Sequence, residues 1–378
     1  MTINVSAVSA GQALKTIKAA ADAQFAFGVK NSIMLWGRPG IGKTQIAEQL
    51  ARHIGGKLYD VRLTTIDTSD LRGLPYYNHE TKTTEWYRPE DLPQDSAPSV
   101  LFLDELSSAP AHIQPTVYGL LQERRVGQHK IPDNVIILAA GNGVADGAVA
   151  YEMGTAIADR LIHIEVVANP EDWVKNYAIP NNLHPAVTAF IRTMPQHFEN
   201  TTDCMKNDKL VACTPRSWEK VSQLMFAIKD PQAKRTLITG IIGDSVASEF
   251  FMIAEDIEAT VQVLEMIKKP RKERMPMVPT NMFGLNAMAF GLISAANAEN
   301  ILPIFQILSD VADRDSFLAQ RTPQDQSKLK MMPLKELATF GMEQLMVKIV
   351  ADQKMMAIVL ASQEYRDYSE ERRRLGLE

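Results

Sequence analysis

The sequence predicts an α/β domain with a parallel, five-stranded sheet covered by helices on both faces, followed by a region built from helices. Three observations support this fold class. Short apolar runs with strand character alternate with helical patterns up to about residue 170. A glycine-rich turn joins the first of these strands to a helix. Farther along the chain the strand signal fades, and apolar residues recur at helical spacing.

The expected elements of the α/β domain begin with a helical pattern at residues 10–28, followed by a short apolar strand that ends at Gly37. Four further apolar runs with strand character lie at residues 57–65, 99–105, 134–142 and 161–167. Strands this apolar are typical of parallel sheets that are buried on both faces. Because ligands bind at the carboxyl ends of parallel strands, we expect Gly37, Asp104 and Asn142 at one edge of the sheet.

The turn after the first strand reads GRPGIGKT, residues 37–44. Its small residues let the backbone approach a ligand, and the following helix points free N–H groups at the same place, which suits phosphate. Lys43 is expected to reach the β- and γ-phosphates, and the Thr44 hydroxyl to bind Mg²⁺. An ordinary strand-to-helix turn is the alternative. The residues expected to contact the nucleotide are Gly37, Arg38, Pro39, Gly40, Ile41, Gly42, Lys43, Thr44 and Gln45.

Two acids, Asp104 and Glu105, close the apolar strand that begins at Ser99. Placing two acids at the end of a buried strand is costly unless a cation or a reacting water is present. Asp104 suits an outer-sphere role on Mg²⁺, and Glu105 suits a base that orients and deprotonates the attacking water. A helix-capping role is the alternative. The phosphate-type loop about 60 residues upstream favours nucleotide hydrolysis.

Composition limits the class of protein. At 378 residues the chain is expected to form two or three units with enough core to fold without disulfides. A net charge of −5 argues against a protein that coats nucleic acid, although it leaves room for a local basic groove. Cys204 and Cys213 lie outside any metal or redox motif. The absence of a signal-peptide pattern and of a run of about 18 apolar residues predicts a cytoplasmic chain with no membrane segment.

Several motifs occur in an order that resembles the AAA+ ATPases, and specifically the MoxR family within them. They are GRPGIGKT, VLFLDELSSAPAHIQPTVYGLLQERRVG, VIILAAGNG and MGTAIADRLIHIEV, and the resemblance covers roughly residues 10–255. Arg38 and Ile41 depart from the proline and threonine that are usual in this loop. The resemblance implies an AAA+ core at residues 1–168, a helical lid at 169–265 and a helical extension at 266–378.

The resemblance also implies roles for three polar residues. Asn142 resembles the sensor-1 residue that helps to hold the attacking water, with a turn-forming asparagine as the alternative. Arg160 resembles the arginine finger that reaches a neighbouring subunit's nucleotide, with a salt bridge to Asp159 or Glu165 as the alternative. Arg216 resembles the sensor-2 arginine of the lid, and a helix-start arginine without ligand contact is its alternative.

Two hairpins are expected in the core. In the family, an insert interrupts the second helix, and here it would lie near residues 73–89. Its aromatic residues either contact a substrate or partner, or pack the hairpin onto its own domain; they are Tyr76, Tyr77, Trp86 and Tyr87. The second hairpin lies at residues 123–134. There Arg124 and Arg125 either face a neighbour's nucleotide or are solvated, and we favour solvation.

The last third of the chain carries weaker signals. The basic stretch KKPRKER, within a linker-like segment at residues 268–281, is expected to be a solvated linker. The tail at residues 364–378 has mixed charges at helical spacing, which indicates an exposed helix end or a disordered tail. Methionines are frequent in this part, and core filling accounts for them better than a client-binding surface does.

The sequence therefore predicts an ATP-dependent, Mg²⁺-dependent remodelling ATPase. The family resemblance implies a homo-oligomeric ring of six subunits, a protein client, and a partner with a von Willebrand A-like domain. Two alternatives stay open. One is an ATP-gated binding switch or scaffold with slow hydrolysis, which only the departures at Arg38 and Ile41 support. The other is a nucleic-acid motor, against which the acidic balance and the lack of stacking aromatics among basic residues argue.

Overall fold

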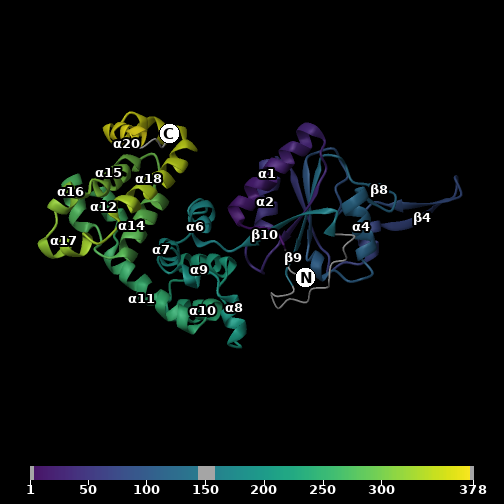
Figure 1. The fold of residues 1–378 in the computed structure, drawn as a ribbon, viewed down its shortest axis with the longest axis horizontal. Helices are drawn as coiled ribbons and strands as arrows, with labels where there is room; N and C mark the ends of the chain where they lie inside the picture. The colour runs from purple at the N-terminus through teal and green to yellow at the C-terminus, as the bar shows by residue number, and fades with distance from the viewer. Residues whose placement is uncertain (1–3, 144–157, 375–378) are drawn as a thin grey trace. The chain divides into compact units, whose positions relative to one another are not determined.

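The computed structural model describes residues 4–143 and 158–374, apart from the side chains of residues 258–260 and 371. The chain divides into two compact units, Met1–Asn169 and Pro170–Glu378. The first unit is α/β and the second is built from helices, as Figure 1 shows. Both observations agree with the predicted fold class. The finer division into a core, a lid and an extension, with boundaries after residues 168 and 265, stays a prediction.

The sheet of the first unit has the order β1-β10-β2-β9-β6-β3, and every neighbouring pair is parallel. Its strands are β1 (Ala7–Ser9), β2 (Ser32–Trp36), β3 (Lys57–Arg62), β6 (Ser99–Asp104), β9 (Val135–Gly141) and β10 (Leu161–Val167). The five predicted strands are confirmed, but the predicted number is wrong, because the sheet has six strands. The edge strand β1 is only 3 residues long, too short to give an apolar pattern in the sequence.

Helices cover both faces of this sheet. On one face α1 (Ala10–Phe27) and α2 (Lys43–His53) pack against alternate residues of the strands, and on the other face α4 (Gln114–Glu123) does so. Along β6, Val100 and Phe102 join the first cluster, whereas Leu101 and Leu103 join the second. Because both sets of side chains are buried, the strand is apolar along its whole length, which is why it was recognisable in the sequence.

The two predicted hairpins are present. β4 (Leu74–Asn78) pairs antiparallel with β5 (Thr83–Tyr87), and the much shorter β7 (Arg125–Val126) pairs with β8 (His129–Lys130). The first hairpin follows the short helix α3 (Thr68–Arg72) and extends away from the sheet, as Figure 1 shows.

The second unit consists of helices packed in pairs. Its elements are α6 (Pro170–Trp173), η3 (Val174–Ala178), α7 (Pro185–Thr193), η4 (Pro195–His197), α8 (Thr201–Lys206), α9 (Pro215–Ala227), α10 (Pro231–Ile242), α11 (Asp244–Thr260), α12 (Val263–Lys268), α13 (Arg271–Arg274), η5 (Met275–Met277), α14 (Met282–Ala295), α15 (Ile301–Ala312), α16 (Arg314–Ala319), α17 (Pro323–Leu329), α18 (Leu334–Val350), α19 (Gln353–Leu360) and α20 (Gln363–Arg374). Phe190, Trp218 and Phe250 make mutual aromatic contacts in its core. Cys204 and Cys213 are buried thiols without a disulfide.

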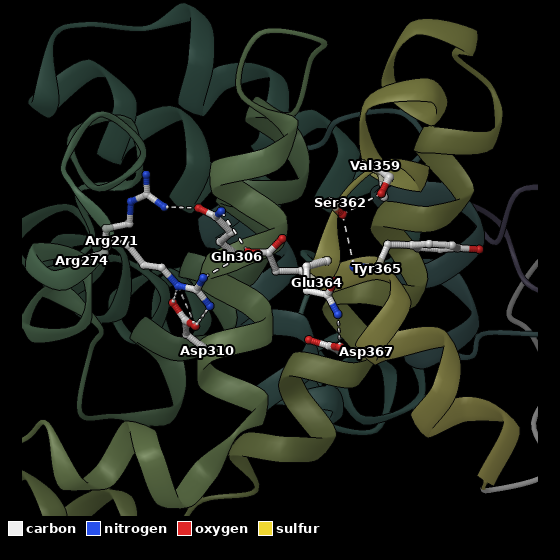
Figure 2. A network of polar contacts seen from close by, with 10 residues as sticks. Arg271, Arg274, Gln306, Asp310, Val359, Ser362, Glu364, Tyr365 and Asp367 are labelled. Atoms are coloured by element: carbon white, nitrogen blue, oxygen red, sulfur yellow. Dashed lines mark hydrogen bonds and ion pairs between the residues drawn. The ribbon is translucent and has the colours of Figure 1, made fainter.

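The prediction of a solvated linker at KKPRKER is wrong in part, because the run contains a helix and a buried Arg274, although most of its residues are exposed. These residues include α13, in which Arg271 forms ion pairs with Asp310 of α15 and Glu364 of α20, as Figure 2 shows. Arg274 is only 7% exposed and donates to the carbonyl oxygen of Lys269 and to Gln306. The two arginines of this basic run are therefore structural. Arg271 neutralises carboxylates of neighbouring helices, and Arg274 donates hydrogen bonds to oxygen acceptors.

The tail forms α20, and of its two predicted alternatives the structure favours a helix. The helix is not merely exposed, since the Tyr368 ring contacts Phe305 of α15 edge-on at 5.9 Å between centroids. Residues 375–378 of the tail lie outside the described part of the chain. Within residues 4–143 and 158–374, every helix falls short of the length or the apolar character that a bilayer crossing requires.

Candidate nucleotide site

The glycine-rich loop lies where the connections of the sheet change direction. It follows β2, whose two neighbours are β9 and β10, and such a switch point in a parallel sheet opens a crevice at the carboxyl ends of the strands. The Gly37 N–H donates to the carbonyl oxygen of Gly141 at 3.2 Å. A Cβ atom on Gly37 would lie 2.5 Å from the Val166 carbonyl oxygen, so only glycine fits between the neighbouring strands.

The rest of the loop leads into α2. Gly40 and Gly42 have φ angles of 82° and 102°, which favour glycine, and Gly42 stands at the N-cap of α2 without a side-chain cap. The N–H groups of the first turn therefore have no side-chain acceptor within the cap, which fits a phosphate ligand. Ile41 is 5% exposed and belongs to the core cluster of α1 and α2. Its departure from the family pattern thus has a packing explanation.

Lys43 and Asn142 lie next to each other, and their roles stay predictions. The Lys43 ammonium donates to Asn142 Oδ1 at 2.8 Å, to the Arg38 carbonyl oxygen at 3.0 Å, and to the Gly37 carbonyl oxygen. The Asn142 N–H donates to Ser107 Oγ at 3.1 Å. The lysine of the loop, the end of β9 and the turn after β6 are therefore joined by a continuous set of hydrogen bonds.

The two acids lie on either side of the end of β6. Asp104 is the last residue of the strand, and its Oδ1 accepts from the Glu105 N–H at 2.9 Å. Glu105 has φ 59°, a left-handed conformation that costs a non-glycine residue about 1–2 kcal/mol and is concentrated at functional sites. The Thr64 hydroxyl donates to the Glu105 carboxylate. The Arg62 guanidinium lies near both acids, with Nη2 3.9 Å from Asp104 Oδ2 and Nε 3.8 Å from Glu105 Oε1.

Thr64, Arg62 and Ser107 were not among the residues predicted from the sequence. Arg62 and Thr64 stand at the carboxyl end of β3, which pairs with β6 in a register that places Arg62 opposite Asp104. The sequence does indicate both strands, but it does not indicate that they are neighbours. The strand order was the missing signal, because in a parallel sheet the residue that follows one strand lies beside the end of its neighbour.

The acids of this edge share a negative field. Partial loss of hydration raises the pKa of Asp60 on β3, and the Asp104 carboxylate raises it further. Glu48 of α2 acts in the same direction, while Arg62 opposes it. Thr44 carries a hydroxyl oxygen and Asp104 a carboxylate, which are the donor types that Mg²⁺ prefers, and their role as metal ligands stays a prediction. The residues present therefore fit the metal that the sequence predicts.

Arg160 lies in the exposed turn that enters β10, and Arg216 lies at the exposed start of α9 in the second unit. The turn that holds Arg160 is tied to the strand before the loop. Trp36 Nε1 donates to His163 Nδ1 at 2.8 Å, and His163 Nε2 lies 2.8 Å from the Ala158 carbonyl oxygen. The roles of both arginines stay predictions. Residues 153–157 of the motif that precedes Arg160 lie outside the described residues.

The solvation predicted for Arg124 is wrong. Its side chain is 7% exposed, and its guanidinium donates to the carbonyl oxygens of Pro132, at 3.2 Å, and of Val135. Burial lowers the pKa of Arg124. The residue has φ 52° and ends α4, so its charge caps backbone carbonyls of the loop that leads to β9. Arg125 is exposed, as predicted.

Three of the four aromatic residues of the first hairpin, Tyr76, Trp86 and Tyr87, make ring contacts. Tyr76 and Tyr87 stack at 4.3 Å between centroids, and the Arg72 guanidinium lies 5.0 Å from the Trp86 ring centroid. These contacts keep part of the hairpin together. Tyr77 and Tyr87 are nevertheless 78% and 63% exposed, so an aromatic surface stays accessible on the first unit.

The strand order, the loop after β2 and the acids after β6 define a P-loop AAA fold. In agreement, the family model described as AAA domain (dynein-related subfamily) matches residues 32–160. This segment contains the loop, both acids, Asn142 and Arg160.

Solved structures with weak overall similarity are also found. A protein of Cytophaga hutchinsonii described as an inferred ATPase has a TM-score of 0.34 and 14% identity, over 89% of this chain and 90% of its own. A point mutant of RuvB from Thermotoga maritima has a TM-score of 0.40 and 14% identity, over 84% of this chain and 91% of its own. Similarities this weak say nothing about what the present chain acts on. Comparison with curated proteins finds no match.

Proposed function

We propose that this chain hydrolyses ATP and uses the energy to remodel a protein client. The observation that supports hydrolysis most directly is the hydrogen-bonded set that joins Lys43, Asn142 and Ser107 at the carboxyl edge of the sheet, next to Asp104 and Glu105. A phosphate-binding loop, a metal-binding acid, a base and a polar group that orients water are the parts that phosphoryl transfer to water needs.

Each residue has one role in the proposed reaction. Lys43 and the N–H groups at the start of α2 bind the phosphates, and Thr44 and Asp104 hold Mg²⁺. Bound Mg²⁺ spreads the negative charge of the phosphates. Asn142 orients the attacking water, and Glu105 accepts its proton as the oxygen attacks the γ-phosphorus and ADP leaves.

Assembly completes the proposed site. Arg160 reaches the nucleotide of a neighbouring subunit, and Arg216 acts from the helical unit of its own subunit, so that the site is most active in a ring of six. We further propose MoxR-type work: a protein client, contacted through the exposed Tyr77 and Tyr87 of the hairpin, and a von Willebrand A-like partner. These assignments rest on the sequence resemblance.

Ile41 and the arginines of the basic run at α13, which bear on the two alternatives, have packing or ionic roles in the structure. The switch or scaffold depended on the changes at Arg38 and Ile41, and Ile41 is a core residue. The nucleic-acid motor requires a basic groove with interleaved aromatic residues. The arginines of the basic run at α13 are instead engaged with other helices, since Arg271 pairs with acids and Arg274 is buried.

Two variants test the proposed chemistry. Lys43→Ala is expected to abolish nucleotide binding, because it removes the ammonium group that is proposed to bind the β- and γ-phosphates. Glu105→Gln is expected to keep binding and to reduce turnover by roughly 10²–10⁴, the usual contribution of a general base. ATP binding by calorimetry and phosphate release would be measured on the full chain. Glu123→Gln, the same change at the exposed end of α4, is the matched control. Normal turnover by Glu105→Gln would exclude Glu105 as the base.

A further inference from the structure

The C-terminal helix α20 is held firmly along one side. Figure 2 shows that Glu364 faces a network with Arg271 and Gln306, at 3.1 Å from each. One and two turns farther along α20, Tyr368 contacts Phe305 and Arg372 pairs with Glu343 of α18 at 2.8 Å. These contacts recur along one face of α20 and fix its orientation. The residues on the rest of the helix surface therefore also have fixed positions.

A hollow of about 620 Å³ lies beside this helix, within the second unit. Its wall is formed by α18, α20 and the π-helical turn η3. Tyr365, Tyr368 and Ser369 of α20 and Met346 of α18 provide ring faces, hydroxyl groups and an apolar patch. In Figure 2 the Tyr365 side chain points away from the ionic network. The volume is within the range of small-molecule sites, about 300–1,000 Å³.

The charge of the lining is positive. Lys175, Arg372 and Arg373 line the hollow, and Glu343 is the one acid among the lining residues in the described part of the chain. The chain as a whole carries −5, so a net positive hollow does not follow from composition alone. The three cations come from two separate elements, η3 and α20, and converge on one space.

One of these cations is already oriented. Arg372 Nη1 donates to Glu343 Oε1 at 2.8 Å and to the Tyr368 hydroxyl at 3.2 Å. Burial raises the pKa of Tyr368, so its hydroxyl stays protonated and can itself donate. A side chain held in place before binding loses less conformational entropy when a ligand arrives.

We propose that this hollow binds a small ligand with two or more negative charges, carried as phosphate or carboxylate groups. Lys175 of η3 and Arg373 of α20 supply charge, Arg372 supplies an oriented guanidinium, and the tyrosines supply hydroxyl donors and ring faces. The site belongs to the helical unit and is separate from the phosphate loop of the first unit.

The test uses the full chain with Arg38→Ala and Lys43→Ala, which together remove both cationic side chains of the phosphate loop. Sodium pyrophosphate and sodium succinate are titrated separately by calorimetry at constant ionic strength, to distinguish phosphate from carboxylate chemistry. We expect saturable binding of one equivalent of at least one probe. Adding Lys175→Ser and Arg373→Ser is expected to weaken it at least about tenfold, since two charge-assisted contacts are lost.

The matched control adds Lys354→Ser and Arg366→Ser to the same background. These residues are exposed on α19 and α20, lie outside the lining, and change the net charge by the same amount. The control is expected to bind within about twofold of its parent. Absence of saturable binding of both probes overturns the proposal, and so does equal weakening by the control. Lys175→Ser alone changes an exposed side chain and serves as a second variant should the double variant fail to fold.

Discussion

At the scale of single residues, the carboxylate of Glu105 depends on Thr64. The Thr64 hydroxyl donates to Glu105, which sits in a left-handed conformation. Thr64→Val keeps the shape of the side chain but removes the donor, so the base loses its orientation. We expect turnover to fall roughly tenfold, because a hydrogen bond to a charged group is worth about 1.5–3 kcal/mol.

The measurement that checks this is steady-state ATP hydrolysis together with the dissociation constant of ATP, which is expected to be unchanged. Thr64→Ser restores the hydroxyl and is expected to recover most of the turnover. Faster hydrolysis by Thr64→Val would show instead that Thr64 holds the base back.

The sequence predicted those site residues that follow a recognisable strand. Asp104, Glu105 and Asn142 stand at the ends of apolar runs, Lys43 begins the helix after the glycine-rich loop, and parallel strands bring their carboxyl ends together. Arg124 was misjudged, because nothing in its local sequence indicates that its charge is buried against carbonyl oxygens that come later in the chain. The features that could not be predicted from the sequence depend mostly on contacts between segments that are distant in the chain.

At the scale of elements, the bridge from Trp36 to His163 joins the end of β2 to β10. Because His163 also binds the carbonyl oxygen of Ala158, the bridge holds the turn that carries Arg160. His163→Phe keeps an aromatic ring and removes both hydrogen bonds. We expect it to lower assembly-dependent turnover by roughly three- to tenfold, with ATP affinity unchanged, because the loop itself is intact.

A variant of Trp36 provides a control for the prediction on His163. Trp36→Phe removes only the hydrogen bond to His163, so the double variant is expected to be no worse than His163→Phe alone. Turnover of the three variants and of the parent forms a double-mutant cycle. Additive losses would mean that the two residues act independently.

The first turn of α7 gives a pH dependence of stability. His184 caps this helix, since its Nδ1 accepts from the Ala186 N–H at 3.3 Å. Burial, with a smaller effect of Lys234, lowers the pKa of His184 from 6.5 to about 4. Between these values the unfolded chain binds the proton and the folded chain does not. The free energy of unfolding is therefore expected to fall by about 1–2 kcal/mol from pH 7 to pH 5.

Urea unfolding at pH 7 and at pH 5 measures this change in the free energy of unfolding. His184→Asn keeps a capping oxygen and does not titrate, so its stability is expected to depend less on pH by that amount. An identical pH dependence in the variant and the parent would assign the acid sensitivity to other groups.

The elements themselves were predictable where one pattern dominated. The five long strands and the hairpin of β4 and β5 have apolar or alternating patterns that local sequence determines. The strand β1 and the helix α13 have no such pattern in their local sequence. β1 is stabilised by pairing with β10, and α13 is stabilised by the ion pairs of Arg271 with Asp310 and Glu364. Their stability comes from tertiary contacts rather than from propensity.

At the scale of the whole molecule, the proposed site is incomplete in one subunit. The first unit supplies the loop, the acids and Asn142, whereas Arg160 stands in an exposed turn. If Arg160 acts on a neighbour's nucleotide, the ATPase rate per subunit must rise as the protein assembles.

Mixing two inactive variants tests this arrangement. Lys43→Ala subunits keep Arg160 but cannot bind ATP, and Arg160→Ala subunits bind ATP but lack the finger. In a mixed ring, an intact loop can face an intact Arg160, so we expect activity to return and to be greatest near equal amounts. Each restored interface regains the finger's contribution, on the order of 10³–10⁵ in rate. Phosphate release would be measured across mixing ratios, with each variant alone as the baseline. A flat response at every ratio, in samples whose mass shows mixed rings, would mean that Arg160 does not act across the interface.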